Sequence, residues 1–198
     1  SIYIPAYNAE KTIKQCIDSV LNQTVKPSKI LIINDCSTDK TKDILLKYNQ
    51  SINIVNNEKN MGVSYSRNLA LQILNSKLIA SIDADVVISQ TWIEQLVDTL
   101  KINNATLVGG RMYEKFINNP CNLWRSIRLK QNWGEHDLSN PPFIFGCNNI
   151  LDTKNLDKKE LYREDNEYYK TNGDDIELCK FLRKNNHKLH YNSEAICY

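Results

Sequence analysis

The chain has 198 residues, which is enough for one domain with a substantial buried core. Its 25 lysines and arginines nearly balance its 23 aspartates and glutamates, and the net charge of +2 gives no support to a dedicated nucleic-acid binder. Only 6 glycines are present, which argues against folds that depend on glycine-rich phosphate loops.

Strands and helices alternate through the first half of the chain. Short apolar runs predict strands at residues 2–4, 30–33, 52–55, 78–82 and 106–108. Apolar residues at helical spacing predict helices over residues 9–21 and 91–100. Two further helices are predicted, one after a start signal at residues 37–39 and one after a turn at residues 60–62. This order predicts an α/β fold with a Rossmann-like, mostly parallel sheet and helices on both faces.

The second half is less regular. Residues 113–142 mix polar, aromatic and basic side chains without a clean period, which predicts a loop-rich region. A recognisable pattern resumes at residues 143–146, and a helix is predicted from Asp175 through Leu182. Residues 187–191 and 195–198 predict two short terminal strands.

The cysteines indicate the redox compartment of the protein. None forms a C-x-x-C pair or has a histidine at metal-ligand spacing, so we expect free thiols at Cys16, Cys36, Cys121, Cys147, Cys179 and Cys197. Free thiols indicate a reducing compartment, the cytoplasm or the cytoplasmic face of a membrane. No apolar run is long enough to span a bilayer, and no signal peptide is visible. The chain opens on a strand without Met and stops in a strand-like run, so we expect a domain excised from a longer protein.

Asp83-Ala84-Asp85 directly follows the fourth predicted strand, where ligands bind in sheets of this kind. Two carboxylates two positions apart in extended chain project to the same side and repel each other unless a cation is near. A hard divalent ion fits, because it takes carboxylate oxygens and also bridges diphosphate oxygens. The alternative is a turn with two solvated acids, since a lone D-x-D is common by chance.

Two further segments fall on the same predicted edge of the sheet. Tyr7 follows the first strand and could stack on a nucleotide base, or simply pack at the sheet edge. Asp35 follows the second strand and could accept a hydrogen bond from a base or ribose, or cap a helix.

The opening run "SIYIPAYNAEKTIKQCIDSVLNQTVKPSKILIINDCSTDKT" resembles that of the family 2 glycosyltransferases, which have the GT-A fold. The segments "NMGVSYSRNLAL", "SIDADVVI", "FIFGCNNIL" and "NGDDIELCKFLRKNNHKLHYNSEAICY" continue the resemblance in order and spacing. The resemblance covers nearly the whole chain and weakens between residues 113 and 142.

The resemblance implies a role for each matching residue on the donor side. It places Pro5, Tyr7 and Asn8 along the nucleotide base, Asp35 at the base or ribose, and Arg67 near the donor diphosphate. In the segment Asp83-Ala84-Asp85, Asp83 would face the ribose and the metal shell, and Asp85 would ligate Mn²⁺ or Mg²⁺.

On the acceptor side the resemblance implies that Asp175 is the general base and that Gly146, Asn148 and Asp174 border the sugar and acceptor. The family's Glu-Asp pair is Asp174-Asp175 here, which shortens the first acid. From the residues alone, helix capping is the favoured interpretation of Asp174 and an equal alternative for Asp175. A helix start would also stabilise the Asp175 anion and make it a weaker base.

The implied activity is that of a metal-dependent, inverting hexosyl- or N-acetylhexosaminyltransferase that uses a nucleotide diphosphate-sugar, with UDP the commonest nucleotide among relatives. The acceptor would be a glycan or a lipid-linked glycan. Residues 1–198 would form one catalytic domain, in which 1–110 bind the nucleotide sugar and 111–198 form a smaller acceptor-binding subregion. The Q-x-x-R-W motif of processive members is absent, and a histidine that often follows the final strand would lie beyond Tyr198.

Residues 121–133 combine aromatic and cationic side chains, and include Trp124, Arg128 and Trp133. They could contact a membrane interface or grip a lipid diphosphate, although ordinary packing over the mouth of the site is the favoured interpretation.

Two rival functions remain open. One is a sugar nucleotidyltransferase, and the other is a non-catalytic domain that binds nucleotide sugars or glycans. A nicotinamide dehydrogenase is excluded because no glycine-rich turn follows the first strand, and a P-loop enzyme because G-K-[ST] does not occur.

Overall fold

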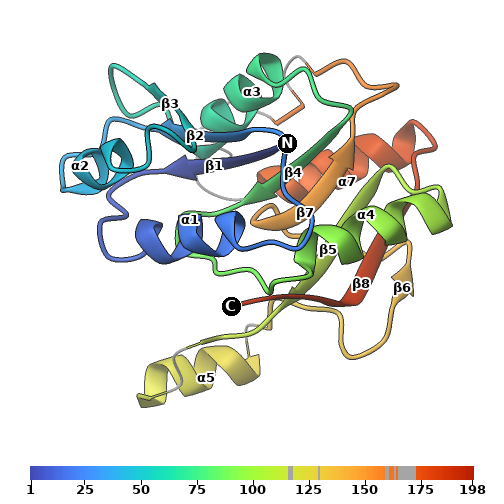
Figure 1. Cartoon of the computed structure of the whole chain (residues 1–198). Helices are drawn as coiled ribbons and strands as arrows, with labels where there is room; N and C mark the ends of the chain where they lie inside the picture. Colours follow the sequence, from blue (N-terminus) through green and yellow to red (C-terminus); the bar gives the residue numbers. More distant parts are fainter. Residues whose placement is uncertain (116–117, 129, 159–160, 163, 165–172) are drawn as a thin grey trace.

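The computed structural model describes residues 1–198 except 116–117, 129, 159–160, 163 and 165–172. The described residues form one eight-stranded sheet with the strand order β3-β2-β1-β4-β7-β5-β8-β6 (Figure 1). The strands are β1 (Ile2–Ala6), β2 (Ile30–Asn34), β3 (Asn53–Asn56), β4 (Leu78–Ile82), β5 (Leu107–Met112), β6 (Leu138–Ser139), β7 (Asn148–Asp152) and β8 (Leu189–Cys197). The helices are α1 (Ile13–Leu21), α2 (Thr41–Leu46), α3 (Val63–Ile73), α4 (Trp92–Asn103), α5 (Pro120–Arg128) and α7 (Asp174–Lys184).

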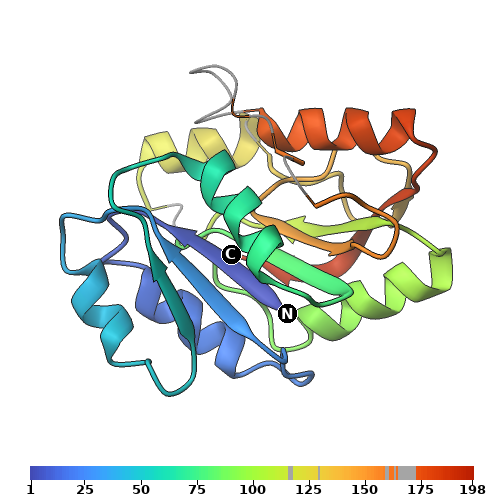
Figure 2. The same ribbon diagram turned by 90° about the horizontal axis from the view of Figure 1, so that it is seen from above.

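The predicted α/β architecture is confirmed. Alternate residues of β1 enter two separate cores, since Ile2 and Ile4 pack with α1, α2 and α4, while Tyr3 packs with α3 and α7. Figure 2 shows these helices on opposite sides of the sheet. Burial on both faces explains why β1 and β2 are apolar at nearly every position.

The sheet is parallel across β3, β2, β1 and β4, and then becomes mixed. Strand β7 enters antiparallel between β4 and β5, and β5 pairs in parallel with β8. The carboxyl ends of β1, β2 and β4 therefore meet at one edge, together with the carboxyl end of β5.

The two predicted terminal strands are one strand, β8. The polar residues Asn192 and Ser193, which separate the two apolar runs, are buried and have partners: Asn192 donates to the buried Thr99 Oγ1 at 2.5 Å, and Ser193 donates to the exposed Asp137 Oδ1 at 3.0 Å. These bonds let a polar stretch continue through the sheet.

Strand β5 likewise extends beyond its predicted end, through Gly109 and Gly110. A Cβ atom on Gly110 would overlap the carbonyl oxygen of Ala195 on β8 and approach Asn148 Oδ1 on β7. Glycine is needed here for close approach of three strands, not for a turn.

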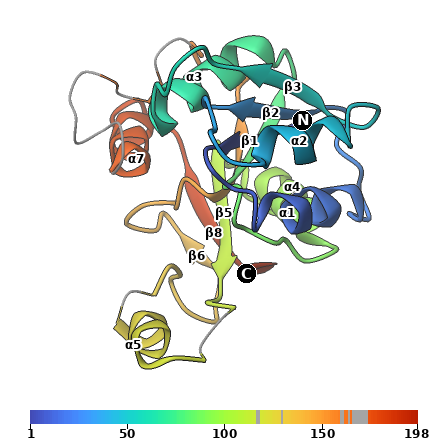
Figure 3. The ribbon, with the colours of Figure 1, turned by 90° about the vertical axis from the view of Figure 1, so that its left-hand side faces the viewer.

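The segment 113–142, predicted to be loop-rich, contains helix α5 and the short strand β6. Figures 1 and 3 show α5 standing away from the sheet, beyond the end of β5. Among the described residues, the helices are all too short or too polar to cross a bilayer.

Candidate functional site

Two cavities meet at the carboxyl ends of the parallel strands. The first has a volume of about 520 Å³ and is lined by Pro5, Tyr7, Asn8, Ala9, Glu10, Lys11, Thr12, Asp39, Ala84 and Asp85. The second, of about 340 Å³, is lined by residues that include Asp83, Asp85, Tyr113, Cys147 and Tyr198. Asp85 and Thr12 belong to both, so these residues form the wall that the two cavities share.

The loops after β1 and β2 are tied together at the first cavity. Asn8, which has a positive φ of 50°, accepts a hydrogen bond from the backbone amide of Thr38 at 2.8 Å. Its own amide donates to Ser37 Oγ at 3.0 Å, and the amide of Ala9 donates to Thr41 Oγ1 at 2.8 Å. These bonds leave the Tyr7 ring 50% exposed beside the cavity, where a planar ligand could stack on it.

Asp83 and Asp85 both line the second cavity, while Ala84 between them is buried. The segment is a turn and not the extended chain that was predicted, since the amide of Val86 donates to the carbonyl oxygen of Asp83 at 3.1 Å, and both carboxylates nevertheless line this cavity. Carboxylate oxygens are ligands that Mn²⁺ and Mg²⁺ accept, so the chemistry of this pair fits such an ion. Among the described residues there is no group of three or more His, Cys, Asp or Glu side chains that could hold a metal. A metal at this pair would therefore need further ligands from a diphosphate and from water.

Arg67 on α3 joins the two acidic segments of the site. Its Nη2 donates to Asp83 Oδ1 at 3.0 Å, and its Nη1 donates to Asp174 Oδ2 at 2.5 Å. The side chains of Arg67 and Asp174 are 5% and 6% exposed, so this ion pair is buried. Burial alone would lower the pKa of Arg67, but the carboxylates of Asp83 and Asp174 outweigh it and raise that pKa above its usual value.

Gly146 completes this arrangement. A Cβ atom at this position would overlap the Arg67 guanidinium, so only glycine lets the turn before β7 lie against it. The amide of Gly146 donates to Asp175 Oδ2 at 3.1 Å. Asn148, the other residue predicted to border the acceptor, is buried and accepts a hydrogen bond from Trp92 Nε1 at 2.7 Å.

The capping interpretation of Asp174 is wrong. Helix α7 has Gly173 as its N-cap, with φ 76° and no side-chain capping bond, while the Asp174 carboxylate is turned to Arg67. The expected weakening of Asp175 as a base is also wrong in direction. Burial raises its pKa above the usual value and outweighs the lowering effects of the Gly146 and Ile176 amides.

Asp35 is buried beneath the edge. Its carboxylate accepts hydrogen bonds from Asn57 Nδ2 at 2.6 Å and from the amides of Met61 and Gly62 at 2.9 and 2.8 Å. These contacts hold the start of α3, whose N-cap is Gly62, against the end of β2. Asp35 does not cap α2, and it is not among the residues that line the first cavity. Its predicted contact with a base or ribose stays a prediction.

Sequence patterns did not point to Tyr113 and Tyr198. The two rings stack with centroids 6.2 Å apart and line the second cavity beside the two aspartates. Their positions directly after β5 and β8, whose carboxyl ends lie at this edge, are the signal that could have identified them.

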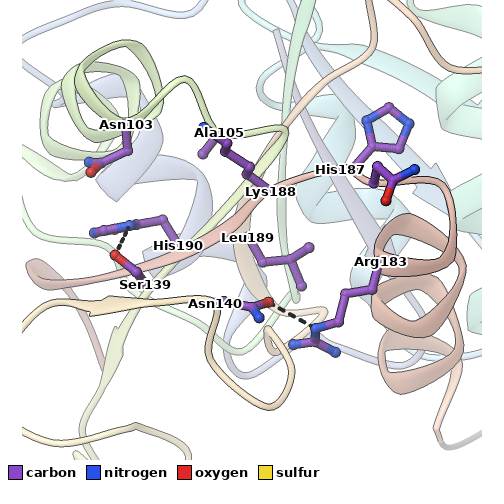
Figure 4. Close-up of a pocket in the computed structure, with 10 residues that line it drawn as sticks. Asn103, Ala105, Ser139, Asn140, Arg183, His187, Lys188, Leu189 and His190 are labelled. Atoms are coloured by element: carbon purple, nitrogen blue, oxygen red, sulfur yellow. Dashed lines mark hydrogen bonds between the residues drawn. The ribbon is translucent and has the colours of Figure 1, made fainter.

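A third cavity, of about 520 Å³, lies at the opposite end of the sheet (Figure 4). It is lined at the start of β8 by Lys188, Leu189 and His190, and at the end of α7 by Arg183 and His187. It contains none of the predicted site residues and is remote from the strand ends that carry them.

Residues 1–184 match the family model described as Glycosyl transferase family 2. Among curated proteins, the chain is 38% identical over 142 residues to the putative teichuronic acid biosynthesis glycosyltransferase TuaG of Bacillus subtilis, covering 66% of this chain and 56% of that protein. It is 35% identical over 120 residues to the Escherichia coli UDP-Glc:alpha-D-GlcNAc-diphosphoundecaprenol beta-1,3-glucosyltransferase WfgD, covering 60% of this chain and 47% of that protein. The chain thus spans about half the length of these relatives.

Two solved structures share the fold. Staphylococcus aureus TarS 1–349 in complex with UDP-GlcNAc superposes with a TM-score of 0.72 at 18% identity, covering 98% of this chain and 58% of that one. The mannosyltransferase PcManGT from Pyrobaculum calidifontis, in complex with GDP-Man and Mn²⁺, gives a TM-score of 0.71 at 16% identity, covering 99% and 55%. At these identities the likeness concerns the fold, which is of the GT-A type.

Proposed function

Because this chain belongs to glycosyl transferase family 2, we propose that it transfers a sugar from a nucleotide diphosphate donor to an acceptor hydroxyl, with inversion at the anomeric carbon. One observation carries this proposal. The Asp83–Arg67–Asp174 network, in which Arg67 and Asp174 are buried, ties the acids that follow β4 to the helix start that carries Asp175, beside two cavities that meet at Asp85.

The donor nucleotide occupies the first cavity in this proposal. Tyr7 stacks on the base, and Pro5 and Asn8 border it. Asp35 either accepts a hydrogen bond from the base or ribose, or positions the start of α3, which it holds by hydrogen bonds. UDP is the proposed nucleotide, because the name of one relative specifies UDP-Glc and one structural neighbour is a complex with UDP-GlcNAc. Residues 1–110 would then form the donor half of one catalytic domain, and residues 111–198 the acceptor half.

A divalent cation, Mn²⁺ or Mg²⁺, is proposed at Asp85 with Asp83 beside it. Support comes from the oxygen ligands that this pair offers and from the Mn²⁺ in the PcManGT complex. When bound, such an ion would neutralise the charge that develops on the departing nucleoside diphosphate.

Asp175 is the proposed general base. Its carboxylate takes the proton of the acceptor hydroxyl while that oxygen attacks the anomeric carbon from the face opposite the diphosphate. The bond between the anomeric carbon and the diphosphate oxygen breaks, and the nucleoside diphosphate leaves with that electron pair. A pKa raised by burial makes Asp175 a stronger base than an exposed aspartate, and such proton transfer contributes about 10²–10⁴-fold in rate. Asp174 holds the helix start through Arg67, and Gly146 orients the base through its amide.

For the acceptor, we propose a glycan carried on a lipid diphosphate. The name of WfgD specifies such an acceptor, GlcNAc-diphosphoundecaprenol. The transferred group would be a hexosyl or N-acetylhexosaminyl unit. We propose the cytoplasm, at a membrane face, as the place of action, which suits the six free thiols.

A donor-hydrolysis assay tests the proposal. The protein is incubated with UDP-Glc, UDP-GlcNAc and GDP-Man, with Mn²⁺, Mg²⁺ or a chelator, and released nucleoside diphosphate is measured. We expect release from a UDP-sugar that depends on the metal. Release of pyrophosphate from UTP and a sugar phosphate would identify a nucleotidyltransferase instead, and binding without any turnover would identify a non-catalytic domain.

A further inference from the structure

Helix α5 exposes a large apolar face. The side chains of Leu123, Trp124 and Ile127 are 46%, 57% and 57% exposed. Residues at these spacings lie on one side of a helix. Figure 3 shows the helix apart from the sheet. Contiguous exposed apolar surface of this kind marks an interaction site.

The charge around this face is one-sided. From Lys115 to Gly134 the sequence has four cations and no acid, with Glu114 and Glu135 at the two ends of this stretch, although acids and bases nearly balance over the whole chain. Of these cations, Arg128 and Lys130 are exposed at and just after the end of α5. An apolar face flanked by cations is typical of a helix that lies in the interface of an anionic bilayer. Each such cation near the surface adds to binding through its attraction to anionic lipids.

The helix also lies beside the route to the candidate site. A cavity of about 300 Å³ is lined by Ser126 of α5, by residues 130–132, and by residues 111–114 at and after the end of β5. It shares Met112, Tyr113, Glu114 and Gln131 with the second cavity, which Asp83 and Asp85 line. A ligand held at α5 could therefore extend from one cavity into the other.

We propose that α5 docks this protein on an anionic membrane surface, with Leu123, Trp124 and Ile127 inserted among the lipids. A lipid-linked acceptor would then enter along α5, with its diphosphate near Lys130 and its sugar in the second cavity. The route of the acceptor rests on the proposed function, whereas the docking of α5 does not.

Co-sedimentation with vesicles tests the docking. Wild-type protein is mixed with vesicles of phosphatidylglycerol and phosphatidylcholine, and with phosphatidylcholine alone. We expect binding to the anionic vesicles that falls at least tenfold in the variant Leu123→Ser/Trp124→Ser/Ile127→Ser. The matched control Leu46→Ser/Ile73→Ser/Ile102→Ser removes three side chains that are 53%, 41% and 82% exposed elsewhere, and it should bind within twofold of wild type. Arg128→Gln/Lys130→Gln should reduce the preference for anionic vesicles.

Several outcomes would overturn the docking. The wild-type protein could stay in the supernatant, or the α5 variant and its control could lose vesicle binding equally. Sedimentation velocity could also show that the wild-type protein is a dimer and that the α5 variant is a monomer. Vesicle binding that the α5 substitutions do not change would also overturn it, because another part of the surface would then make the contact.

The two proposals fail separately. The α5 variant should keep metal-dependent hydrolysis of the UDP-sugar, and Asp175→Asn should keep vesicle binding. Vesicle binding without any donor turnover would contradict the proposed function alone, and turnover without vesicle binding would contradict the docking alone.

Discussion

Arg67 lies between two carboxylates that belong to different segments of the site. The resemblance placed it near the donor diphosphate, but both of its terminal nitrogens donate to protein carboxylates. We therefore expect Arg67 to act as a positioning residue, which fixes the helix start that carries Asp175 relative to the acids after β4.

Replacing Arg67 with Met should lower both stability and turnover. It leaves the buried Asp174 carboxylate without its cation, and breaking a buried ion pair costs about 3–5 kcal/mol. If Arg67 only positions other groups, the Kd for UDP should change less than about threefold while kcat falls at least a hundredfold. Urea unfolding, calorimetry with UDP and steady-state kinetics measure the three quantities.

Two further variants separate the loss of the Arg67 charge from a displacement of its guanidinium. Arg67→Met/Asp174→Asn removes both charges and should recover part of the stability, while Gly146→Ala should disturb the guanidinium without removing it and lower kcat. A Kd for UDP that rises with the loss of kcat in Arg67→Met would instead make Arg67 a diphosphate ligand.

Asp175→Asn should reduce transfer by at least about 10²-fold and leave donor binding nearly unchanged. Because burial raises the pKa of Asp175, the wild-type rate should fall as pH decreases through a value above that of an ordinary aspartate. Comparable turnover in wild type and variant would remove Asp175 from the mechanism.

The same substitution makes a prediction about stability. A carboxyl whose pKa is raised by folding binds protons more tightly in the folded state, so its contribution becomes more favourable as pH falls through that range. Asp175→Asn should therefore have a higher Tm than wild type at pH 7, and the difference should shrink as pH falls towards 4. A thermal-denaturation series across pH measures this, and a gap that widens on acidification would contradict it.

At the scale of elements, β2 and α3 depend on one buried carboxylate. The Met61 and Gly62 amides donate to different oxygens of Asp35, so Asp35→Asn leaves one of them without its acceptor, and leaving a buried donor unsatisfied costs about 1–3 kcal/mol. Urea unfolding should show this loss, whereas Asp43→Asn on the exposed side of α2 should change stability by less than about 0.5 kcal/mol. Equal stabilities for the two variants would contradict the role assigned to Asp35.

At the scale of the whole molecule, stability should be uneven. Strands β1 and β2 are buried on both faces, while α5 stands apart with an exposed apolar face. We expect amides of β1 and β2 to exchange with solvent only on global unfolding, and amides of α5 to exchange orders of magnitude faster. Hydrogen-exchange mass spectrometry measures both, and similar protection in the two regions would contradict this view of α5.

Sequence alone predicted the first half of the fold well, because each of its strands contains a short apolar run, although β1 continues through Pro5 to Ala6, beyond its predicted end. It missed the continuity of β8 and the length of β5, since both depend on partners that are distant in the chain, Thr99 for Asn192 and Ala195 for Gly110. Asp83 and Asp85 stood out by their spacing. The contacts of Arg67 and Asp35 did not, because a local pattern does not specify which buried groups a charged side chain will meet.

The wall that the two cavities share suggests a way to design an inhibitor. Among the residues that the structure describes, Thr12 and Asp85 are common to both linings, so a partition that includes these two residues lies between chambers of about 520 and 340 Å³. Weak fragments that fill each chamber, joined by a short bridge over that partition, would gain the effective concentration that tethering provides. An inhibitor built in this way would span the junction between the halves proposed here for donor and acceptor.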